Sequence, residues 1–256
     1  MDKNIDVLVV GAGLAGLLAA HRLQSANLSV VVVEKARGVG GRLATWRLGP
    51  GRGDYGAQFF TVREPAFQHY VDAWQQAGLV FEWSRGWNDS SGRRALPDDW
   101  HPRYAVAGGM TAVAKHLAQS LTIHNQTRLA ALQLAENGWK AVSENGRLFQ
   151  ADRILLTPPV PQSLALLKAG NVPLRKSDRA ALEKIDYAPC LSGLFWIEGS
   201  VSLPEPGALQ RPEAAVSWLA DNRQKGISPE ATIITAHIQP ALSTLWYPAP
   251  NEELSA

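Results

Sequence analysis

The start of the chain alternates between short apolar runs and a segment with helical character. Residues 6–10 read DVLVV, a β-branched run without polar alternation that predicts a buried parallel strand. Residues 14–25 are rich in alanine and leucine and predict a helix, and residues 29–33 form a second β-branched run. A strand, a helix and a strand of these lengths predict a βαβ unit.

The middle of the chain mixes both patterns. After Pro65, apolar and aromatic residues recur with helical spacing, so a helix is expected that ends at Gly78. Another helix is expected after residues 108–109. The sequence ENG at 136–138 and at 144–146 predicts two hairpin turns, hence a small antiparallel meander. Other expected elements are strands at 121–124, 128–135, 139–143, 148–150 and 153–157, and strands with loops at 83–101.

Beyond residue 161 prolines are frequent and polar loops separate the apolar runs, which predicts a second lobe built on an antiparallel sheet. Its expected strands are 191–197, 216–219 and 232–237, and its expected helices 163–167 and 177–184. The predicted lobes are residues 1–75 with 103–160, and residues 76–102 with 161–256.

The glycines between the first strand and the first helix predict a dinucleotide site. Gly11 permits a tight turn, Gly13 lets the backbone approach a pyrophosphate, and Gly16 lets the helix pack closely on the sheet. The helix N-terminus favours that anion, and Glu34 at the end of the second strand can accept hydrogen bonds from a ribose. A glycine-rich turn without a ligand is the alternative, but strand, helix, second strand and acid are all in place.

Residues 34–42, EKARGVGGR, add glycines and arginines that a nicotinamide dinucleotide site does not require. Adjacent glycines let the backbone approach a phosphate, and Arg42 can give the diphosphate a charge-assisted hydrogen bond. A flexible surface loop with a solvated arginine is the other interpretation.

Composition narrows the function classes. Hydrophobic residues make up 46% of the 256-residue chain and charged residues 19%, as in globular proteins, and a net charge of +2 provides no basic surface for nucleic acid. The single cysteine, Cys190, excludes a disulfide framework and a thiolate metal site, and no metal ligands cluster. No apolar run approaches the roughly 20 residues of a membrane span and no signal peptide is evident, so a cytoplasmic protein is expected.

The N-terminal sequence DVLVVGAGLAGLLAAHRL, followed by VVVVEKARGVGGRLAT, resembles the FAD-binding N-terminus of the flavin amine oxidase superfamily. DYGAQFFTVR (54–63), AVAGGMTAVAKHLA (105–118) and ADRILLTPPVPQSLALL (151–167) resemble its renalase branch, particularly the bacterial members. The likeness extends over essentially the whole chain. It implies an α/β fold, with a Rossmann-type FAD lobe like that of glutathione reductase and an α+β substrate lobe with an antiparallel sheet.

The resemblance also implies residues that bind FAD without a covalent bond. Residues around Ala15 would line the pyrophosphate, Glu34 would hold the ribose, and Arg42 would reach the phosphates. Residues 56–58 would lie against the flavin ring, and residues 128–129 would hold the adenine edge. The full set is Gly11, Gly13, Leu14, Ala15, Gly16, Glu34, Lys35, Gly41, Arg42, Gly56, Ala57, Gln58, Arg128, Leu129 and Thr157. Plain packing, loop or surface roles are the alternatives for Ala57, Gln58 and Arg128.

The activity implied by the renalase branch is oxidation of 2- and 6-dihydro isomers of NAD(P)H to NAD(P)+, with the hydride passing to flavin and O2 reduced to H2O2. Such a substrate already contains a transferable hydride, so no general base is needed and no catalytic side chain is assigned. An amine oxidase or desaturase of the same superfamily, and a non-catalytic flavoprotein remnant, are the alternatives.

The second lobe supplies candidates for a substrate pocket. Phe195, Trp196 and Trp218 could form an apolar wall, and Arg223 could meet a substrate phosphate. Core packing for the tryptophans and a structural role for a histidine remain open. The candidates are Trp196, Trp218, Asn222, Arg223 and His237.

Two further expectations concern the cysteine and the end of the chain. Cys190 lies away from the segment where related monoamine oxidases attach flavin, so a buried, inert thiol is expected. The superfamily's final strand, Gly-Asp turn and helix have no counterpart after His237, so a C-terminal truncation is expected, or completion by another chain. The oligomeric state is not predicted.

Overall fold

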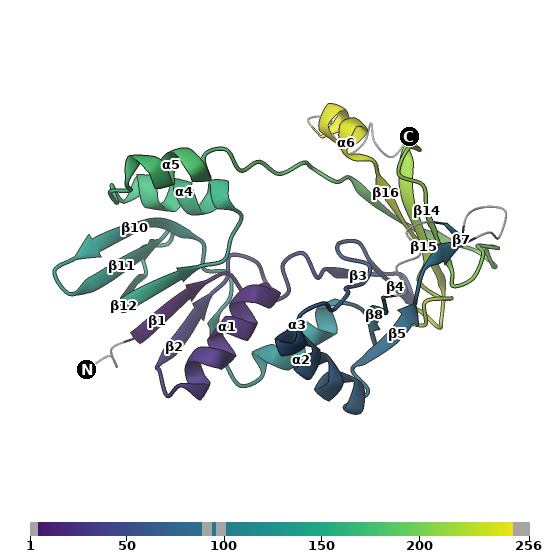
Figure 1. Ribbon diagram of the computed structural model, residues 1–256, viewed down its shortest axis with the longest axis horizontal. Helices are drawn as coiled ribbons and strands as arrows, with labels where there is room; N and C mark the ends of the chain where they lie inside the picture. The colour runs from purple at the N-terminus through teal and green to yellow at the C-terminus, as the bar shows by residue number, and fades with distance from the viewer. Residues whose placement is uncertain (1–4, 89–93, 96–100, 248–256) are drawn as a thin grey trace. The chain divides into compact units, whose positions relative to one another are not determined.

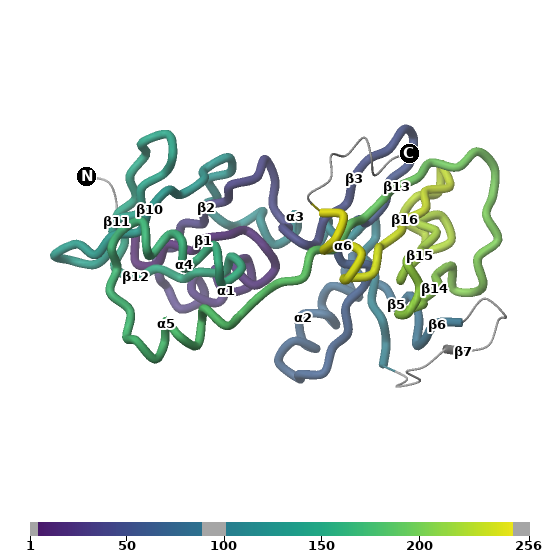
Figure 2. Tube along the Cα trace, turned by 90° about the horizontal axis from the view of Figure 1, so that it is seen from above, coloured from purple at the N-terminus to yellow at the C-terminus, as the bar shows by residue number. Residues whose placement is uncertain are grey.

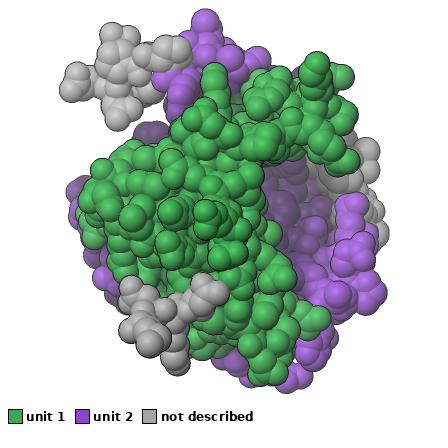
Figure 3. All heavy atoms as spheres, turned by 90° about the vertical axis from the view of Figure 1, so that its left-hand side faces the viewer, with its two compact units in different colours: residues 1–41, 114–187 green, residues 42–113, 188–256 purple. Residues whose placement is uncertain are grey.

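The computed structural model describes residues 5–88, 94–95 and 101–247 (Figure 1). Contacts divide the chain into unit 1, residues 1–41 with 114–187, and unit 2, residues 42–113 with 188–256 (Figure 3). Helix α3, Thr111–Ala118, crosses the boundary between them. The lobe boundaries expected from the sequence stay a prediction.

Unit 1 is built on a six-stranded sheet in the order β10-β11-β12-β1-β2-β9 (Figure 1 and Figure 2). The β-branched runs form its parallel centre, where β1 pairs with β12 on one side and with β2 on the other. The antiparallel meander is confirmed at the β10 edge. The strands are β1 Ile5–Val10, β2 Val30–Val33, β9 Thr122–His124, β10 Leu129–Ala135, β11 Gly138–Ser143 and β12 Leu148–Leu156.

Strand β12 corrects one prediction. Residues 148–150 and 153–157 were expected to form two strands, but they belong to a single strand. Its first part pairs antiparallel with β11 and its second part pairs parallel with β1, and Ala151 is paired on both sides. No glycine or proline separates the two parts, so nothing ends the extended backbone between them.

Helices cover the sheet of unit 1. Helix α1, Leu14–Ser25, packs on β1 and β2. Helix α4, Val160–Ala169, lies against β10, and α5, Lys176–Leu182, contacts α4 (Figure 1). Leu166 and Leu167 of α4 pack on a core that the strands provide. That core comprises Leu8, Val10, Val33, Leu129, Leu132, Ala141, Phe149 and Ala151.

Unit 2 contains a four-stranded antiparallel sheet in the order β13-β16-β15-β14. Three of its strands confirm the sequence expectation: β13 Ser192–Ile197, β15 Val216–Asp221 and β16 Thr232–Ile238. The fourth, β14 Ala208–Gln210, is too short for a pattern to reveal. A hairpin of β3, Thr45–Leu48, and β4, Gly51–Asp54, was also not expected, because its glycine-rich sequence has no apolar run.

The hairpin packs on the sheet through its glycines. A Cβ at Gly51 would lie 2.5 Å from Ile233, and one at Gly53 would lie 2.7 Å from Leu194. Only residues without a side chain allow this close approach.

Unit 2 also contains an aromatic core of Phe59, Trp83 of β5, Trp87 of β6 and Trp218 of β15. Part of the expected region 83–101, residues 89–93 and 96–100, lies outside the described residues. Helix α6 follows β16 although no helix was expected there; Pro240 occupies its first turn and Gln239 caps it. The other elements are α2 Pro65–Gln76, β5 Val80–Ser84, β6 Trp87–Asn88, β7 Arg94–Ala95, β8 Arg103–Val106 and α6 Pro240–Trp246.

Candidate functional site

In the turn between β1 and α1, each of the three glycines occupies a different structural environment. Gly11 has φ +100°, a conformation that side chains disfavour. A Cβ at Gly16 would lie 2.0 Å from the carbonyl oxygen of Gly11, so only glycine lets α1 pack here. A Cβ at Gly13 would meet nothing within 4 Å, so space is open beside the helix N-terminus. That open space suits the pyrophosphate that the sequence pattern predicts.

Glu34 lies beside this turn, at the carboxyl end of β2. Its carboxylate is buried and accepts two backbone hydrogen bonds, from the N–H of Ala12 at 2.8 Å and from the N–H of Ala36 at 2.8 Å. A carboxylate has about four acceptor positions, so each oxygen retains capacity for a hydroxyl group. The backbone therefore holds Glu34 in one orientation in which a ribose diol can bind.

The glycines of residues 34–42 fold back onto the turn. The N–H of Gly40 donates to the carbonyl of Ala12 at 2.8 Å. Gly40 and Gly41 have positive φ, and a Cβ on Gly41 would lie 3.6 Å from the Cα of Gly13. This second glycine segment brings more backbone to the same open space, as expected for a site that binds a diphosphate closely.

Thr157 completes the group of predicted residues in unit 1. It follows β12, and its hydroxyl donates to the carbonyl of Val10 at 2.8 Å. Gly11, Gly13, Glu34, Gly41 and Thr157 thus lie around the carboxyl ends of parallel strands, where ligands bind in sheets of this kind.

Three other predicted residues of unit 1 have protein partners. Lys35 donates to the side chain of Gln162 on α4 at 2.9 Å. Arg128 is exposed beside Glu144, with 3.7 Å between Nε and the carboxylate, and its carbonyl accepts from the N–H of Glu144. Leu129 is part of the core. Their roles toward FAD stay predictions, as do those of Leu14 and Ala15 in the first turn of α1.

The remaining cofactor candidates belong to unit 2, where residues 54–58 begin with the last residue of β4. A Cβ at Gly56 would lie 2.1 Å from the carbonyl oxygen of Arg42, and the N–H of Ala57 donates to the same carbonyl at 2.9 Å. The side chain of Arg42 is exposed. The Gln58 side chain is buried, and its Nε2 donates to the carbonyls of Asp54 and Gly56.

The Oε1 of Gln58 provides a test of whether these residues fit FAD. It is buried, and among the described residues no group donates to it. A buried acceptor without a partner is costly, and flavin contains an N–H group that could satisfy it. Within unit 1, the open glycine turn and the oriented Glu34 carboxylate suit the diphosphate and ribose of FAD.

Two residues that the sequence reasoning missed hold residues 54–58. Asp54 and Lys225 form an ion pair with 2.7 Å between Oδ2 and Nζ, and both side chains are 0% exposed. Burial lowers the pKa of Lys225, and the neighbouring Asp54 carboxylate raises it. Asp54 starts the quoted sequence DYGAQFFTVR, which could have drawn attention to it, whereas no pattern singles out Lys225.

The substrate candidates of unit 2 differ in accessibility. Trp196 is 53% exposed and its ring covers Gly49, and the Arg223 side chain is exposed. Trp218 is buried in the aromatic core, and buried Asn222 bonds to Ile233 and other neighbours.

The expected apolar wall of Phe195, Trp196 and Trp218 needs correction. Successive residues of a strand point to opposite faces, so Phe195 and Trp196 cannot line the same surface of β13. Trp218 pairs with His237, and His237 pairs with Ser192, so these three side chains lie on one face of the sheet. Trp196 lies on the same face, because it is four residues after Ser192 on β13.

His237 is half-buried near residues 54–58. Its Nε2 lies 3.2 Å from the carbonyl oxygen of Tyr55. Burial is the main cause that lowers the pKa of His237; the Tyr55 carbonyl raises it and the charge of Lys225 lowers it further. The imidazole is therefore neutral near neutral pH, and because the carbonyl can only accept, Nε2 bears the hydrogen.

Cys190 contradicts the expectation of a buried thiol, because the residue is exposed. It lies in the segment that leads into β13, where neighbouring residues 187 and 188 are also exposed. The residues next to Cys190 in the sequence show no periodic pattern of apolar positions that would indicate whether the thiol is buried.

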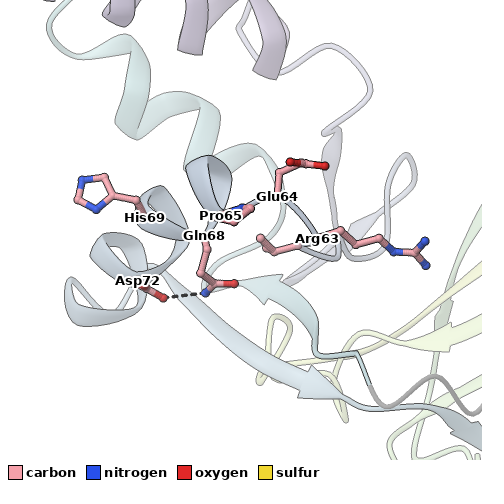
Figure 4. Close-up of a pocket in the computed structure, with 7 residues that line it drawn as sticks. Arg63, Glu64, Pro65, Gln68, His69 and Asp72 are labelled. Carbon is pink, nitrogen blue, oxygen red and sulfur yellow. Dashed lines mark hydrogen bonds between the residues drawn. The ribbon is translucent and has the colours of Figure 1, made fainter.

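Other parts of the described chain offer less chemistry. Within the described ranges no group of His, Cys, Asp or Glu residues could hold a metal ion, and no helix has the length and apolarity to cross a membrane. A hollow of about 390 Å³ lies at the start of α2, and Gln68 donates to Asp72 beside it (Figure 4). Its lining contains no predicted site residue: Val62, Arg63, Glu64, Pro65, Gln68, His69 and Asp72.

Comparison with protein families matches two parts of the chain. A model of NAD(P)-binding Rossmann-like domains matches residues 9–74, and a model of flavin containing amine oxidoreductases matches residues 81–254. The second match covers more than half of the chain and includes most of unit 2.

Individual relatives differ in how much of the chain they match. Renalase of Mus musculus is 24% identical over 238 residues, which cover 86% of this chain and 67% of renalase. A possible lysine-specific histone demethylase 1 of Drosophila melanogaster is 44% identical over 55 residues, only 22% of this chain and 6% of that protein. The chain therefore spans a small part of the demethylase and about two thirds of renalase.

Among solved structures, wild-type putrescine oxidase bound to putrescine has the same fold. The TM-score is 0.72, and the match covers 98% of this chain and 79% of that chain at 16% sequence identity. The predicted fold class, a Rossmann-type nucleotide-binding lobe with an antiparallel substrate lobe, is confirmed by these matches.

Proposed function

The chain belongs to the flavin containing amine oxidoreductases, and on this premise we propose that it is a renalase-like oxidase of dihydronicotinamide dinucleotides. Family membership makes it an FAD-dependent oxidoreductase, and we propose that it acts on a small molecule with O2 as electron acceptor. The proposed part is the substrate, the 2- or 6-dihydro isomers of NAD(P)H, together with the bacterial renalase-like branch and a cytoplasmic location.

The observation that supports this substrate best is the length of the match to renalase. Substrate specificity is determined largely outside the dinucleotide-binding turn, which many enzymes share. A relative aligned along 86% of the chain includes the substrate-binding part, whereas the 55-residue match to the demethylase is too short to do so fully.

For the cofactor, we assign the pyrophosphate to the glycine turn at Gly11 and Gly13 and the ribose to Glu34. The N-terminus of α1 and the backbone of Gly41 stabilise the negative charge of the diphosphate. Gln58 accepts a hydrogen bond through its unpaired Oε1. Bound FAD supplies the hydride acceptor and the route by which two electrons reach O2, which yields H2O2.

For the substrate, the exposed groups of unit 2 provide complementary contacts. The Trp196 ring can stack on a nicotinamide, and the Arg223 guanidinium can bind a phosphate in two-pronged geometry. His237 is neutral and holds Tyr55 through Nε2, so its Nδ1 can accept a hydrogen bond. Trp218 and Asn222 are buried within unit 2, Trp218 in the aromatic core and Asn222 bonded to Asp54, Ile233 and Thr235. Catalysis then requires orientation of the ring and exclusion of water more than proton transfer.

The test is anaerobic mixing of the FAD-loaded protein with 6-dihydro-NAD, with visible flavin absorbance as the readout. We expect bleaching by the 2- or 6-dihydro isomers, no bleaching by ordinary NADH, and recovery of absorbance with formation of H2O2 when O2 is admitted. Bleaching by an amine such as putrescine, with none by either isomer, would overturn the proposed substrate.

Amine oxidation is the second candidate, and the fold shared with putrescine oxidase favours it. The same experiment separates the two, because an amine substrate and a dihydronicotinamide are offered to the same flavin. The remaining alternative, a remnant without activity, predicts that neither an amine nor either isomer bleaches the flavin in this experiment.

A further inference from the structure

We infer that Lys225 is a positioning residue whose ammonium group closes residues 54–58 into a fixed loop that presents Gly56, Ala57 and Gln58. This inference rests on the proposed function in one respect, since that function assigns the same three residues to the flavin ring.

The ammonium group bonds to both ends of the loop. Lys225 Nζ donates to Oδ2 of Asp54 at 2.7 Å and to the carbonyl oxygen of Gln58 at 2.6 Å. These partners precede Lys225 by 171 and 167 residues. One charged group thus joins the first and the last residue of the loop, which the Gln58 side chain also links through its bond to the Asp54 carbonyl. No other described residue bonds to both acceptors of Lys225.

Asp54 anchors the loop to the rest of unit 2. Its Oδ1 accepts from the hydroxyl of Thr45 at 2.6 Å and from the N–H of Met110 at 2.8 Å. Its backbone N–H donates to Asn222 at 3.2 Å, and its carbonyl accepts from the hydroxyl of Thr235 at 2.8 Å. Side chains from β3, from β16 and from the residue after β15, together with a backbone N–H just before α3, therefore all converge on the residue to which Lys225 is paired.

The surroundings of Lys225 indicate that it positions the loop at residues 54–58 rather than simply increasing the stability of the fold. Both charges are completely buried, and Nζ lies 4.8 Å from the ring centroid of Trp83. A buried ion pair is often no more stabilising than apolar residues of similar volume, because both charges lose their hydration. What apolar residues cannot replace is a donor that binds an aspartate and a backbone carbonyl at the same time. The same loop contains the unpaired Oε1 of Gln58, whose direction depends on the loop's conformation.

The experiment compares three full-length variants with the unchanged protein. Lys225→Met leaves the buried Asp54 carboxylate without its cationic partner, so it is expected to lower the melting temperature strongly. The double variant Lys225→Met/Asp54→Asn removes both charges and keeps an Oδ1 acceptor for Thr45 and Met110, so it should recover much of that loss. Lys184→Met, at an exposed lysine of unit 1, is the matched control.

The decisive readout is amide hydrogen exchange in the FAD-free double variant. We expect exchange to rise in residues 54–58 while β16 remains protected as in the unchanged protein. Exchange that is unchanged in residues 54–58, or that rises equally in β16, would overturn the inference, because the pair would then be replaceable or only generally stabilising. The control should show neither change.

FAD binding provides a second, separate readout. If the loop presents residues 56–58 to flavin, the double variant should bind FAD roughly tenfold more weakly, with a shifted visible spectrum. Full FAD affinity in a double variant with a loosened loop contradicts the assignment of residues 56–58 to flavin in the proposed function and leaves the positioning role of Lys225 supported.

Discussion

The glycine turn of unit 1 and the loop at residues 54–58 of unit 2 are both proposed to contact FAD, yet they are held in different ways. The turn is fixed by neighbours: Gly11, Gly13, Gly16 and Glu34 lie within one βαβ unit, where Gly11 bonds to β2 and Ala12 bonds to the Glu34 carboxylate. The loop is fixed by residues remote in sequence, above all Lys225. Local geometry leaves a recognisable motif in the sequence, whereas long-range contacts leave almost none.

The largest expected effect separates two glycines of the turn. Gly16→Ala puts a Cβ 2.0 Å from a backbone oxygen, so the helix or the turn must shift, at a cost of about 3 kcal/mol or more in the free energy of unfolding. Gly13→Ala is the matched control for stability, because its Cβ meets nothing within 4 Å and should change that free energy by less than about 0.5 kcal/mol.

The same pair sharpens the ligand assignment. If the open space at Gly13 holds the pyrophosphate, Gly13→Ala should weaken FAD binding while urea unfolding of the FAD-free protein remains unchanged. Equal stability losses in the two variants would show that the open space has a structural use instead.

An intermediate effect is expected at Glu34. Glu34→Gln replaces one acceptor oxygen by an NH2 group that would face a backbone N–H, either that of Ala12 or that of Ala36. The loss of one charge-assisted bond and of the ribose acceptor should weaken FAD binding roughly ten- to a hundredfold. Titration of the FAD-free protein with FAD, followed by flavin fluorescence, measures the change. The exposed Glu136→Gln of the meander turn is the control, and an affinity equal to its value would contradict the role of Glu34.

The smallest effect concerns pH and the loop of unit 2. Burial lowers the pKa of His237 below its usual 6.5, so the unfolded chain binds a proton first as the pH falls. The stabilising contribution of the neutral imidazole is therefore complete above about pH 6.5 and decreases as the pH drops toward the lowered value.

His237→Gln should reduce the fall in melting temperature between about pH 7.5 and about pH 5.5. His69→Gln, at an exposed histidine of α2, should leave that fall unchanged. A pH dependence that is the same in both variants would show that folding does not lower the pKa of His237.

The predictability of the fold follows the same division. The βαβ unit and the meander were predicted, because β-branched runs, alanine-rich helices and ENG turns act over short distances. The β3–β4 hairpin was missed because Gly51 and Gly53 serve packing against Leu194 and Ile233, which appear much later in the sequence. A strand selected by such a contact lacks the apolar alternation by which strands are recognised.

The candidate site was predictable to a similar degree. Gly11, Gly13, Gly16 and Glu34 follow from the spacing of one motif. Residues 56–58 and Thr157 came from a family resemblance, and the buried Lys225 was invisible, because a lone lysine in a polar turn is usually solvated. Cys190 shows the opposite error: an apolar residue type suggested burial where the chain is exposed.

The unbroken strand β12 limits how this protein can change in length. Because Ala151 is paired with β1 and with β11, both halves of the strand share one register. Inserting a single residue there would turn the following side chains to the other face and carry Thr157 away from Val10. Insertions and deletions accumulated during evolution should therefore be confined to the turns at 136–137 and 144–147, where length can vary while the register at the nucleotide-binding end is preserved.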